Sequence, residues 1–469
     1  MADGRTTVAR ERGRQGLGEG LRGVTSALTA WLTRPLASFH LLLAVFGLLV
    51  TFGLVMVLSA SSVESFSEAG SSYSIFLRHL AHCALGAVGC YAAMRVPVWM
   101  LRRFSHVFLL VSLVLLGLVL TSLGARDNGA QSWLVLGPLS FQPVEPAKIA
   151  LALWGAHVLV TKRALLGQYR HLLVPVVPAA LLMFALVMMQ PDLGSTVLLG
   201  VVLLALLWFA GAPLRLFSAI LLGGLTAAVA LVLVGGYQIG RVSSFLDPQS
   251  DPRGSGFQAN QALLALADGG MFGEGLGRGW SKWQYLPEAY NDFIFAVVGE
   301  ELGFVGCATL LVLFGVTAYV GMRIAARNTD PWIRLVAATL TTWLVAQAAI
   351  NIGYVVGLLP VTGLPLPLIS SGGTSVVTTM IVFGLLANFA RHEPEAIAAL
   401  RSLGPGRVGR LLRLPTPAPY RPPARRSPPA GKRTAPPAEK PSGKSGGGAS
   451  RARRNRSSTG SSRRPRASR

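Results

Sequence analysis

The sequence has little charge for its length. Of its 469 residues, 13% are charged and 51% are hydrophobic, and its mean hydropathy is +0.51. Because a soluble globular protein carries about 25% charged residues, this composition excludes a soluble protein with one core of this size. Acidic residues are the scarcest charged class, with 20 Asp and Glu against 43 Lys and Arg.

Cysteine is almost absent. The three cysteines, Cys83, Cys90 and Cys307, lie in apolar stretches without a CxxC pattern or metal-ligand spacing. We expect them to be small core residues, and they carry no information about the redox compartment. No cluster of metal-ligand residues is visible elsewhere, so the sequence predicts no dedicated metal site.

The C-terminal segment lacks acids and apolar residues. Residues 401–469 contain 19 Lys and Arg but a single acid, Glu439, so this segment contributes +18 of the net charge of +23. Its Pro, Ser, Gly and Arg cannot bury a core, which predicts a disordered basic tail over 393–469. Beside a membrane this tail would bind anionic membrane lipids. No folded module supports binding to nucleic acid.

Long apolar runs are abundant instead. Because a helix of about 20 apolar residues crosses a bilayer core of about 30 Å, these runs predict ten transmembrane helices. The first run follows a polar, Arg-containing segment, 1–36, and is therefore not a cleavable signal peptide. The sequence predicts an all-α polytopic membrane domain over 37–392. The predicted spans are 39–60, about 79–94, 104–123, 144–161, 171–189, 193–211, 216–235, 293–320, 333–359 and 367–390.

Basic residues alternate between the loops. The loops after the second, fourth, sixth and eighth spans contain ten Lys and Arg, whereas the short loops after the first, third, fifth and ninth contain only Arg78 and Arg126. Short cytoplasmic loops are enriched in Lys and Arg, so both termini are predicted to be cytoplasmic. The large loop between the seventh and eighth spans, 236–292, is then extracellular, and it holds six of the 20 acids.

Charged side chains near membrane helices are candidates for function, because charge in hydrocarbon is costly. Glu145 and Lys148 are three residues apart on one face of the fourth span, where they can pair. A structural ion pair and a site for a charged substrate both remain open. Asp192 precedes the sixth span, where it can cap the helix or bridge to Lys148.

The stretch WQYLPEAYNDFIFAVVGEELGFVG, 283–306, contains the most unusual acids. Asp292 stands where the large loop enters the eighth span, either as the N-cap of the helix or as a general base in an acid-rich, aromatic rim. Glu300 and Glu301 fall about two turns inside this span. We expect them to face a polar cavity or to pair with a base from another span.

Prolines and glycines break the stretch NIGYVVGLLPVTGLPLPLISSGGTS, 351–375. Irregular backbone at membrane depth occurs only where it is buried in protein or lines a cavity. The SSGG sequence at 370–373 could in addition present its N–H groups to an anion, as glycine-rich turns do.

Six motifs, in this order, resemble the SEDS family of membrane proteins (shape, elongation, division and sporulation). They are NGAQSW, QPVEPAK, QPDLG, GFQANQALLALADGG, LPEAYNDFIFAVVGEELG and LPVTGLPLPLISSGGTS, and the resemblance covers about residues 39–392. The run ARHEPEAIAALR after the last span and the Arg/Pro-rich tail look like those of actinobacterial members of the cell-division branch.

The resemblance implies a GT-C-like bundle of ten helices that polymerises lipid II into glycan strands outside the cytoplasmic membrane, at the division septum. It implies a class B penicillin-binding protein, the division transpeptidase, and other division membrane proteins as partners. It assigns the catalytic acid to Asp292. The substrate-binding candidates are Glu145, Lys148, Asp192, Arg241, Gln258, Gln261 and Glu288, and Asp247 matches a further polar position of the family's large loop.

The chain departs from the family pattern at three places. Tyr290 and Asn291 replace the usual His-Thr before the catalytic Asp, so a histidine that would tune Asp292 is missing. Val144 replaces a frequent Ser, and Ser132 replaces an Arg. None of these changes removes a proposed catalytic group.

The implied chemistry needs a single base. An α-linked donor that gives a β-linked product requires one inversion, and pyrophosphate leaves without a general acid, unlike in glycoside hydrolases, where two carboxylates are usual. Arg241, Lys148, Arg278 and Lys282 are the cations available to the pyrophosphate. No cofactor is certain from the sequence, and a divalent cation, Mg²⁺ or Mn²⁺, held between pyrophosphate and carboxylates is compatible with it.

Two other functions remain open. A lipid II flippase would also use broken helices and buried charges, but it needs polar groups across the full depth of the bilayer, whereas the acids here gather near the predicted outer face. A noncatalytic scaffold of the division machinery would depend on the termini, with the basic tail as a docking site.

Overall fold

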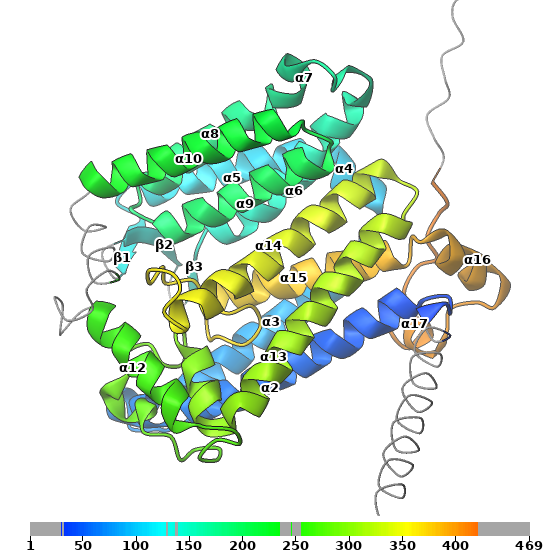
Figure 1. The fold of residues 1–469 in the computed structure, drawn as a ribbon. Coiled ribbons are helices and arrows are strands. Elements are labelled where there is room, and N and C mark those ends of the chain that lie inside the picture. Colours follow the sequence, from blue (N-terminus) through cyan, green and yellow to red (C-terminus); the bar gives the residue numbers. More distant parts are fainter. Residues whose placement is uncertain are drawn as a thin grey trace, which may run out of the picture. The chain divides into compact units, whose positions relative to one another are not determined.

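Five long helices form one half of the computed structural model, whose elements are labelled in Figure 1. They are α2 (Ala37–Ala69), α3 (Ser74–Arg95), α13 (Ile294–Arg327), α14 (Pro331–Val355) and α15 (Gly373–Ala390). Among the described residues, these five are long and apolar enough to cross a membrane. The structure describes residues 30, 32–127, 130–136, 139–234, 245 and 255–420.

Five further helices form the other half. They are α5 (Ser105–Val119), α6 (Val144–Thr161), α8 (Val176–Met188), α9 (Leu193–Phe209) and α10 (Leu214–Val234). Each of the ten predicted spans overlaps one helix of these two sets. The number of ten membrane crossings stays a prediction, because within the described residues none of these five helices combines the length and hydropathy of a membrane span.

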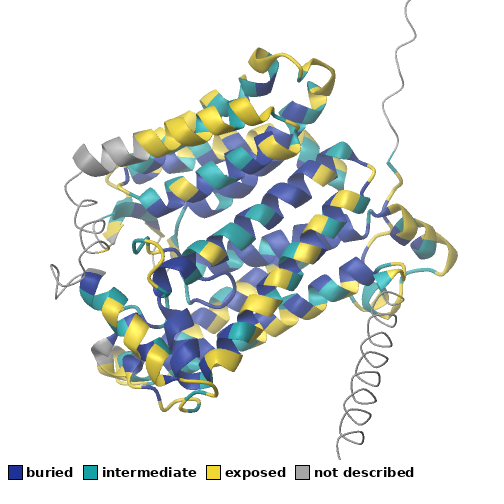
Figure 2. Cartoon of the chain, in the orientation of Figure 1, coloured by how far each residue is buried: buried dark blue, intermediate teal, exposed yellow. Residues whose placement is uncertain are grey.

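The two halves meet at α14. It packs against α13 on one side and against α9 and α6 on the other, while α3 lies along α15. Figure 2 shows that α14 and α15 are largely buried, whereas α8 and α10 expose much of their surface. A helix that is apolar on all sides is stable only when it is surrounded, which explains why α15 lies inside the bundle.

A three-stranded antiparallel sheet corrects the purely α-helical prediction. It consists of β1 (Gly124–Asp127), β2 (Ala130–Leu136) and β3 (Leu139–Phe141), in the order β1-β2-β3. Along β2 the side chains alternate in burial, with Ser132 and Leu134 buried and Val135 exposed, as expected for a strand with one covered face. The hydropathy analysis missed the sheet because its short strands lie between two apolar helices and give no separate hydropathy signal.

The segment after α15 is ordered further than predicted. Residues Pro394–Ser402 form α16 and Arg407–Leu411 form α17. Arg327 at the end of α13 donates to both oxygens of Glu395, at 2.6 Å each. Burial raises the pKa of the neighbouring Glu393 carboxyl above its usual value. The expected start of disorder at residue 393 is therefore too early, and residues 421–469 lie outside the described residues.

The predicted large loop, 236–292, contains structure of its own. It includes α12 (Ser255–Asp268) and a short π-helix, η3 (Ser281–Tyr285). In Figure 1, α12 and the β1–β3 sheet lie at one end of the helices, and α16 and α17 lie at the opposite end. The predicted site residue Arg241 and its neighbour Asp247 lie outside the described residues.

The contact between α3 and α15 depends on a close backbone approach at Gly384. A methyl group at Gly384 would collide with the backbone oxygen of Cys90. We therefore expect Gly384→Ala to lower the free energy of unfolding by about 1–3 kcal/mol, because the two helices must separate. Thermal unfolding of the purified protein in detergent measures this change.

Gly117 of α5 provides the control, since a methyl group there would meet no atom within 4 Å. Gly117→Ala should leave the unfolding temperature unchanged or raise it, because alanine favours helix over glycine. Equal unfolding temperatures for the Gly384→Ala and Gly117→Ala variants would contradict this account of the interface.

Candidate active site

A broken backbone segment, 356–372, connects α14 to α15 and forms the centre of the candidate site. Its second part is buried, including Leu364, Leu366 and Ile369, whereas Leu358 and Leu359 in its first part are exposed. The segment has no regular helix of its own, so its carbonyl groups need partners from elsewhere in the protein. This confirms the prediction that the Pro- and Gly-rich stretch is irregular, and residues 366–370 of it are buried in protein.

Polar side chains of α14 supply those partners. The Gln347 side-chain amide donates to the Pro365 carbonyl at 2.9 Å. Asn351 and Tyr354 both donate to the Leu364 carbonyl, at 2.7 and 2.9 Å. All three donor side chains are fully buried. The end of α14 therefore holds the broken segment by hydrogen bonds from one helix face.

The same two residues hold Asp292. Its backbone carbonyl accepts a hydrogen bond from the Asn351 amide at 2.9 Å, and this carbonyl also lies 2.8 Å from the Tyr354 hydroxyl, whose single hydrogen it shares with the Leu364 carbonyl. The N-cap position of α13 is occupied by Phe293, so the alternative that Asp292 is this N-cap is wrong. Asp292 is instead the last residue of the loop, and it is half-buried.

The carboxylate of Asp292 lies against the broken segment at Gly363. A methyl group at Gly363 would stand 3.4 Å from Oδ2 of Asp292. Gly363 has a φ of +70°, in the left-handed region that glycine adopts without strain, and it is exposed. Asp292 and Gly363 therefore meet at an accessible point of the surface.

Glu288 shapes the turn that leads to Asp292. Its φ is +58°, which is uncommon for a residue with a side chain, and its carbonyl accepts the N–H groups of Asn291 and Phe293. The Asn291 amide donates to Glu288 Oε2 at 3.4 Å. Glu288 and Asp292 thus lie on one tight turn, as expected for two groups of the same site.

The SSGG sequence does not offer the expected row of free N–H groups. The N–H of Ser371 donates to the Tyr290 carbonyl at 3.2 Å, and that of Ser370 donates to the Leu366 carbonyl at 3.0 Å. The hypothesis of an anion site is therefore wrong for Ser370 and Ser371. Their N–H groups pin the broken segment to the turn that carries Asp292 and to itself.

Lys148 is enclosed beside this network. Its ammonium group lies 2.9 Å from Oε1 of Glu145 and 4.6 Å from the centre of the Trp343 ring, and the side chain is fully buried. The Trp343 indole in turn donates to Gln347. Because a buried charge is costly without partners, this arrangement fits a structural ion pair. The predicted contact of Glu145 and Lys148 with substrate stays a prediction.

Asp192 caps α9, as one of its two interpretations predicted. Its carboxylate accepts the Ser195 N–H at 2.9 Å, and Oδ2 also accepts the Gln142 side-chain amide at 3.3 Å. The alternative bridge to Lys148 is wrong, because Lys148 pairs with Glu145. At the start of α9, a methyl group at Gly194 would stand 2.8 Å from the Thr362 carbonyl, so the broken segment also contacts this end of α9.

Glu300 and Glu301 act as a clamp on the large loop. Glu300 accepts the N–H groups of Trp280 and Ser281, and Glu301 accepts the Ser59 hydroxyl of α2 at 2.6–2.7 Å. The Lys282 ammonium lies 3.8 Å from Glu301. The base that pairs with Glu301 therefore comes from the loop and not from another span.

This result also corrects the expectation that Lys282 is available to a pyrophosphate. Its side chain is buried between Glu301 and the Gly277 carbonyl. Arg278, the neighbouring candidate cation, is exposed.

The backbone of α13 completes the clamp. At Gly303 the helix leaves helical geometry (φ +65°, ψ −164°), and loop residues satisfy the groups that this break frees. Gly275 donates to the Glu301 carbonyl at 3.0 Å, and Phe304 donates to the Gly270 carbonyl at 2.9 Å. Residues 270–282 are therefore fixed to α13 by side chains and backbone together.

Gln261 lies beside this clamp. It lines a cavity of about 200 Å³ with Trp280, Ser281 and Glu300, so Glu300 faces a polar cavity, as predicted. Gln258 lies one turn earlier on α12 and is half-buried. The predicted binding of substrate by both glutamines stays a prediction.

The sequence analysis missed Gln142, Gln347, Asn351 and Tyr354. A signal for two of them exists, since Gln347 and Asn351 are polar residues four apart within an apolar membrane helix and so share one face. Such residues in a span commonly face a partner or a cavity. Their acceptors in the broken segment are not visible from the sequence.

Comparison with known proteins identifies the family. The family model for FtsW, RodA and SpoVE, described as cell cycle protein, matches residues 39–395. The chain belongs to the FtsW/RodA/SpoVE family. The probable peptidoglycan glycosyltransferase FtsW of Mycobacterium tuberculosis is 51% identical to it over 395 residues, which are 84% of this chain and 75% of that protein. The stage V sporulation protein E of Bacillus subtilis is 39% identical over 74% of this chain and 95% of that protein.

Solved structures of the FtsW/RodA/SpoVE family share the fold. A chain from a peptidoglycan synthase complex, described as coordinating polymerization and crosslinking, aligns with a TM-score of 0.64 at 28% identity, over 75% of this chain and 97% of that chain. The rod shape determining protein RodA of Thermus thermophilus aligns with a TM-score of 0.55 at 27% identity, over 78% of this chain and 99% of that one. The SEDS resemblance of the motifs is confirmed.

The clamp leads to a prediction about local opening. Glu300→Ala leaves the N–H groups of Trp280 and Ser281 without their acceptor, and for the buried Ser281 N–H this loss costs about 1–3 kcal/mol. Amide hydrogen exchange in residues 276–284 should therefore accelerate roughly tenfold or more. Mass spectrometry of the full chain in detergent measures the exchange.

Glu274→Ala is the control, because it removes an exposed acid of the same loop and should leave the exchange rate unchanged. Equal exchange rates in the Glu300→Ala and Glu274→Ala variants would contradict the clamp.

Proposed function

We propose that this protein is a peptidoglycan glycosyltransferase that polymerises lipid II into glycan strands during septal cell-wall synthesis, with Asp292 as the general base. One observation carries the proposal: the half-buried carboxylate of Asp292 lies beside the exposed Gly363 of the broken segment, and buried side chains of α14 hold the Asp292 backbone carbonyl. The family membership and the high identity to proteins named peptidoglycan glycosyltransferase FtsW support the reaction class.

The proposed step is a single displacement. Asp292 takes the proton of the acceptor sugar's 4-hydroxyl while that oxygen bonds to the anomeric carbon of the donor. The bond from this carbon to the pyrophosphate oxygen breaks, and undecaprenyl pyrophosphate leaves with the electron pair. A positioned base of this kind accelerates a reaction by roughly 10²–10⁴-fold. The position of Asp292 on a short turn beside the exposed Gly363 supports this role, because its carboxylate faces the broken segment there.

The leaving pyrophosphate needs positive charge. Arg278 is the exposed cation of the described part of the loop, and Arg241 is a further candidate from the sequence. Among the described residues, no three His, Cys, Asp or Glu side chains are grouped as ligands. No step is therefore assigned to a metal; a divalent cation, Mg²⁺ or Mn²⁺, held between pyrophosphate and carboxylates stays a proposal.

The proposed partners follow from the reaction. Glycan strands must be cross-linked, and a family neighbour of known structure is part of a peptidoglycan synthase complex that combines polymerization with crosslinking. We propose a class B penicillin-binding protein as the transpeptidase partner, together with other membrane proteins of the division machinery. The distribution of Lys and Arg supports cytoplasmic termini and an active end outside the membrane.

The alternatives make different demands on the molecule. A lipid II flippase needs polar groups through the whole depth of the bundle. Here Asp192, Asp292 and Asn351 all lie at one end of the bundle, at the start of α9, before the start of α13 and near the end of α14. A noncatalytic scaffold would need no accessible carboxylate at this end. Both observations favour the polymerase.

Asp292→Asn tests the base directly. Polymerisation of purified lipid II by the full chain, alone and together with its class B partner, should fall by roughly 10²–10⁴-fold, because the amide cannot accept the proton. Glu274→Gln is the control, since Glu274 is an exposed acid of the same loop and its loss removes the same charge.

The outcomes are distinct. Unchanged polymerisation by a folded Asp292→Asn variant would move the base to another group, with Glu288 the next candidate. If no variant polymerises and the native chain instead moves fluorescent lipid II across vesicles, the polymerase proposal fails and the flippase replaces it.

A second prediction concerns the positioning of Asp292. Removing both donors to its carbonyl, in the double variant Asn351→Ala and Tyr354→Phe, should lower kcat roughly ten- to hundredfold while KM changes little, because a misplacement of about 1 Å is enough for such a loss. Thr339→Val on the same helix is the control. Its buried hydroxyl has no described hydrogen-bond partner, so kcat should stay native. A loss confined to KM would contradict the positioning role.

A further inference from the structure

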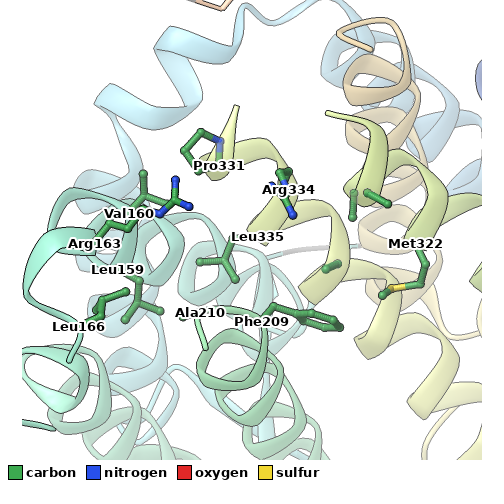
Figure 3. Close-up of a pocket in the computed structure, with 13 residues that line it drawn as sticks. Leu159, Val160, Arg163, Leu166, Phe209, Ala210, Met322, Pro331, Arg334 and Leu335 are labelled. Carbon is green, nitrogen blue, oxygen red and sulfur yellow. The ribbon is translucent and has the colours of Figure 1, made fainter. Parts of the chain in front are cut away.

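A groove opens at the opposite end of the bundle from Asp292. Asp292 immediately precedes the start of α13, whereas the groove lies near the end of that helix, between α13, the start of α14, and the ends of α6 and α9 (Figure 3). Its volume is about 330 Å³, which is within the usual range for sites that bind small ligands. It is a separate feature from the candidate active site.

The walls of the groove are apolar except for two arginines. Figure 3 shows the guanidinium groups of Arg163 and Arg334 above the apolar side chains of Leu159, Phe209 and Leu335. None of the residues that line the groove is acidic. The two charged side chains and the apolar surface therefore occupy different parts of the groove.

The two arginines lack partners within the described part of the chain. Neither guanidinium forms an ion pair with a described carboxylate, and both side chains are exposed. Arg327, at the same end of the bundle, is in contrast occupied by Glu393 and Glu395. Arg163 and Arg334 therefore keep their hydrogen-bond donors available to a ligand.

Small side chains leave the space between the helices unfilled. Ala325 and Ala326 of α13, Ala338 of α14 and Ala210 after α9 all line the groove. α14 packs against both α13 and α9 and so forms the wall that the two sides share. In a bilayer, an apolar groove of this kind beside membrane helices is open to lipid chains and not to water.

We propose that this groove binds an anionic phospholipid. The phosphodiester lies between Arg163 and Arg334, and one acyl chain runs along Leu159, Phe209 and Leu335. Arginine presents a fork of N–H donors that fits phosphate oxygens, and two such forks bind one phosphate from two sides. A zwitterionic headgroup carries a cation that the same two arginines repel, so the site should select lipids with net negative charge.

The position of the arginines agrees with such a headgroup. Arg163 lies just after the end of α6, and Arg334 lies in the first turn of α14. Basic residues at helix ends meet the lipid phosphates at the membrane surface, which is where anionic lipids attract them. The basic tail is not required for this site, because every lining residue lies within residues 159–338.

Native mass spectrometry of the full chain in detergent tests the proposal, with dioleoyl phosphatidylglycerol and dioleoyl phosphatidylcholine as the two probes. The native protein should bind phosphatidylglycerol more tightly than phosphatidylcholine. The double variant Arg163→Gln and Arg334→Gln should weaken phosphatidylglycerol binding roughly tenfold or more and abolish the preference between the two lipids.

Two further variants make the result specific. Arg170→Gln with Arg215→Gln removes two exposed arginines outside the groove, so it loses the same charge and should retain native affinity. Ala326→Phe fills the groove from its exposed rim and should weaken the binding of both lipids, because the acyl chain loses its place.

The proposal is overturned if the Arg163/Arg334 double variant binds phosphatidylglycerol like the native chain. It is equally overturned if the Arg170/Arg215 control loses as much affinity, or if Ala326→Phe has no effect. Lipid II polymerisation is measured on the same variants as a separate readout, so a failure of the proposed enzymatic function is distinguished from a failure of this site.

Discussion

Backbone polar groups inside a membrane protein must find hydrogen-bond partners within the protein, and this constraint organises the candidate site. The segment between the membrane helices α14 and α15 is not helical. Its backbone carbonyls therefore need hydrogen bonds from side chains. Gln347, Asn351 and Tyr354 meet that need from one face of α14. The same donors position Asp292. The place of the proposed base therefore depends on the hydrogen bonds that stabilise the broken segment.

The break in α13 obeys the same constraint. At Gly303 the freed backbone groups pair with residues 270–275 of the large loop, and the carboxylates of Glu300 and Glu301 extend the contact to Trp280, Ser281 and Lys282. The loop and the helix break therefore stabilise each other. Acids that would be costly in hydrocarbon are stable here because each has N–H, hydroxyl or ammonium partners.

Local signals in the sequence were enough for part of this picture. Hydropathy located the helices because burial in a membrane depends on about 20 consecutive residues. The cap at Asp192, the Glu145–Lys148 pair and the irregular stretch after Asn351 were also predictable, since each depends on neighbours within a few positions. The partners of Glu301 and Asp292 were not, because Ser59 and Tyr354 lie 242 and 62 residues away along the chain. The strands of the β1–β3 sheet were not predicted for a different reason, because they are shorter than any hydropathy window.

The sharing of donors at the end of α14 has a mechanical consequence. The carbonyls of Asp292 and Leu364 are bound to the same two side chains, Asn351 and Tyr354. A piston-like displacement of α14 along its axis would carry both carbonyls together and preserve the spacing between the carboxylate and Gly363. Only a motion that pulls the start of α13 away from α14 can change that spacing. The spacing between the Asp292 carboxylate and Gly363 therefore withstands a shift of α14 along its axis but changes when the start of α13 and α14 separate.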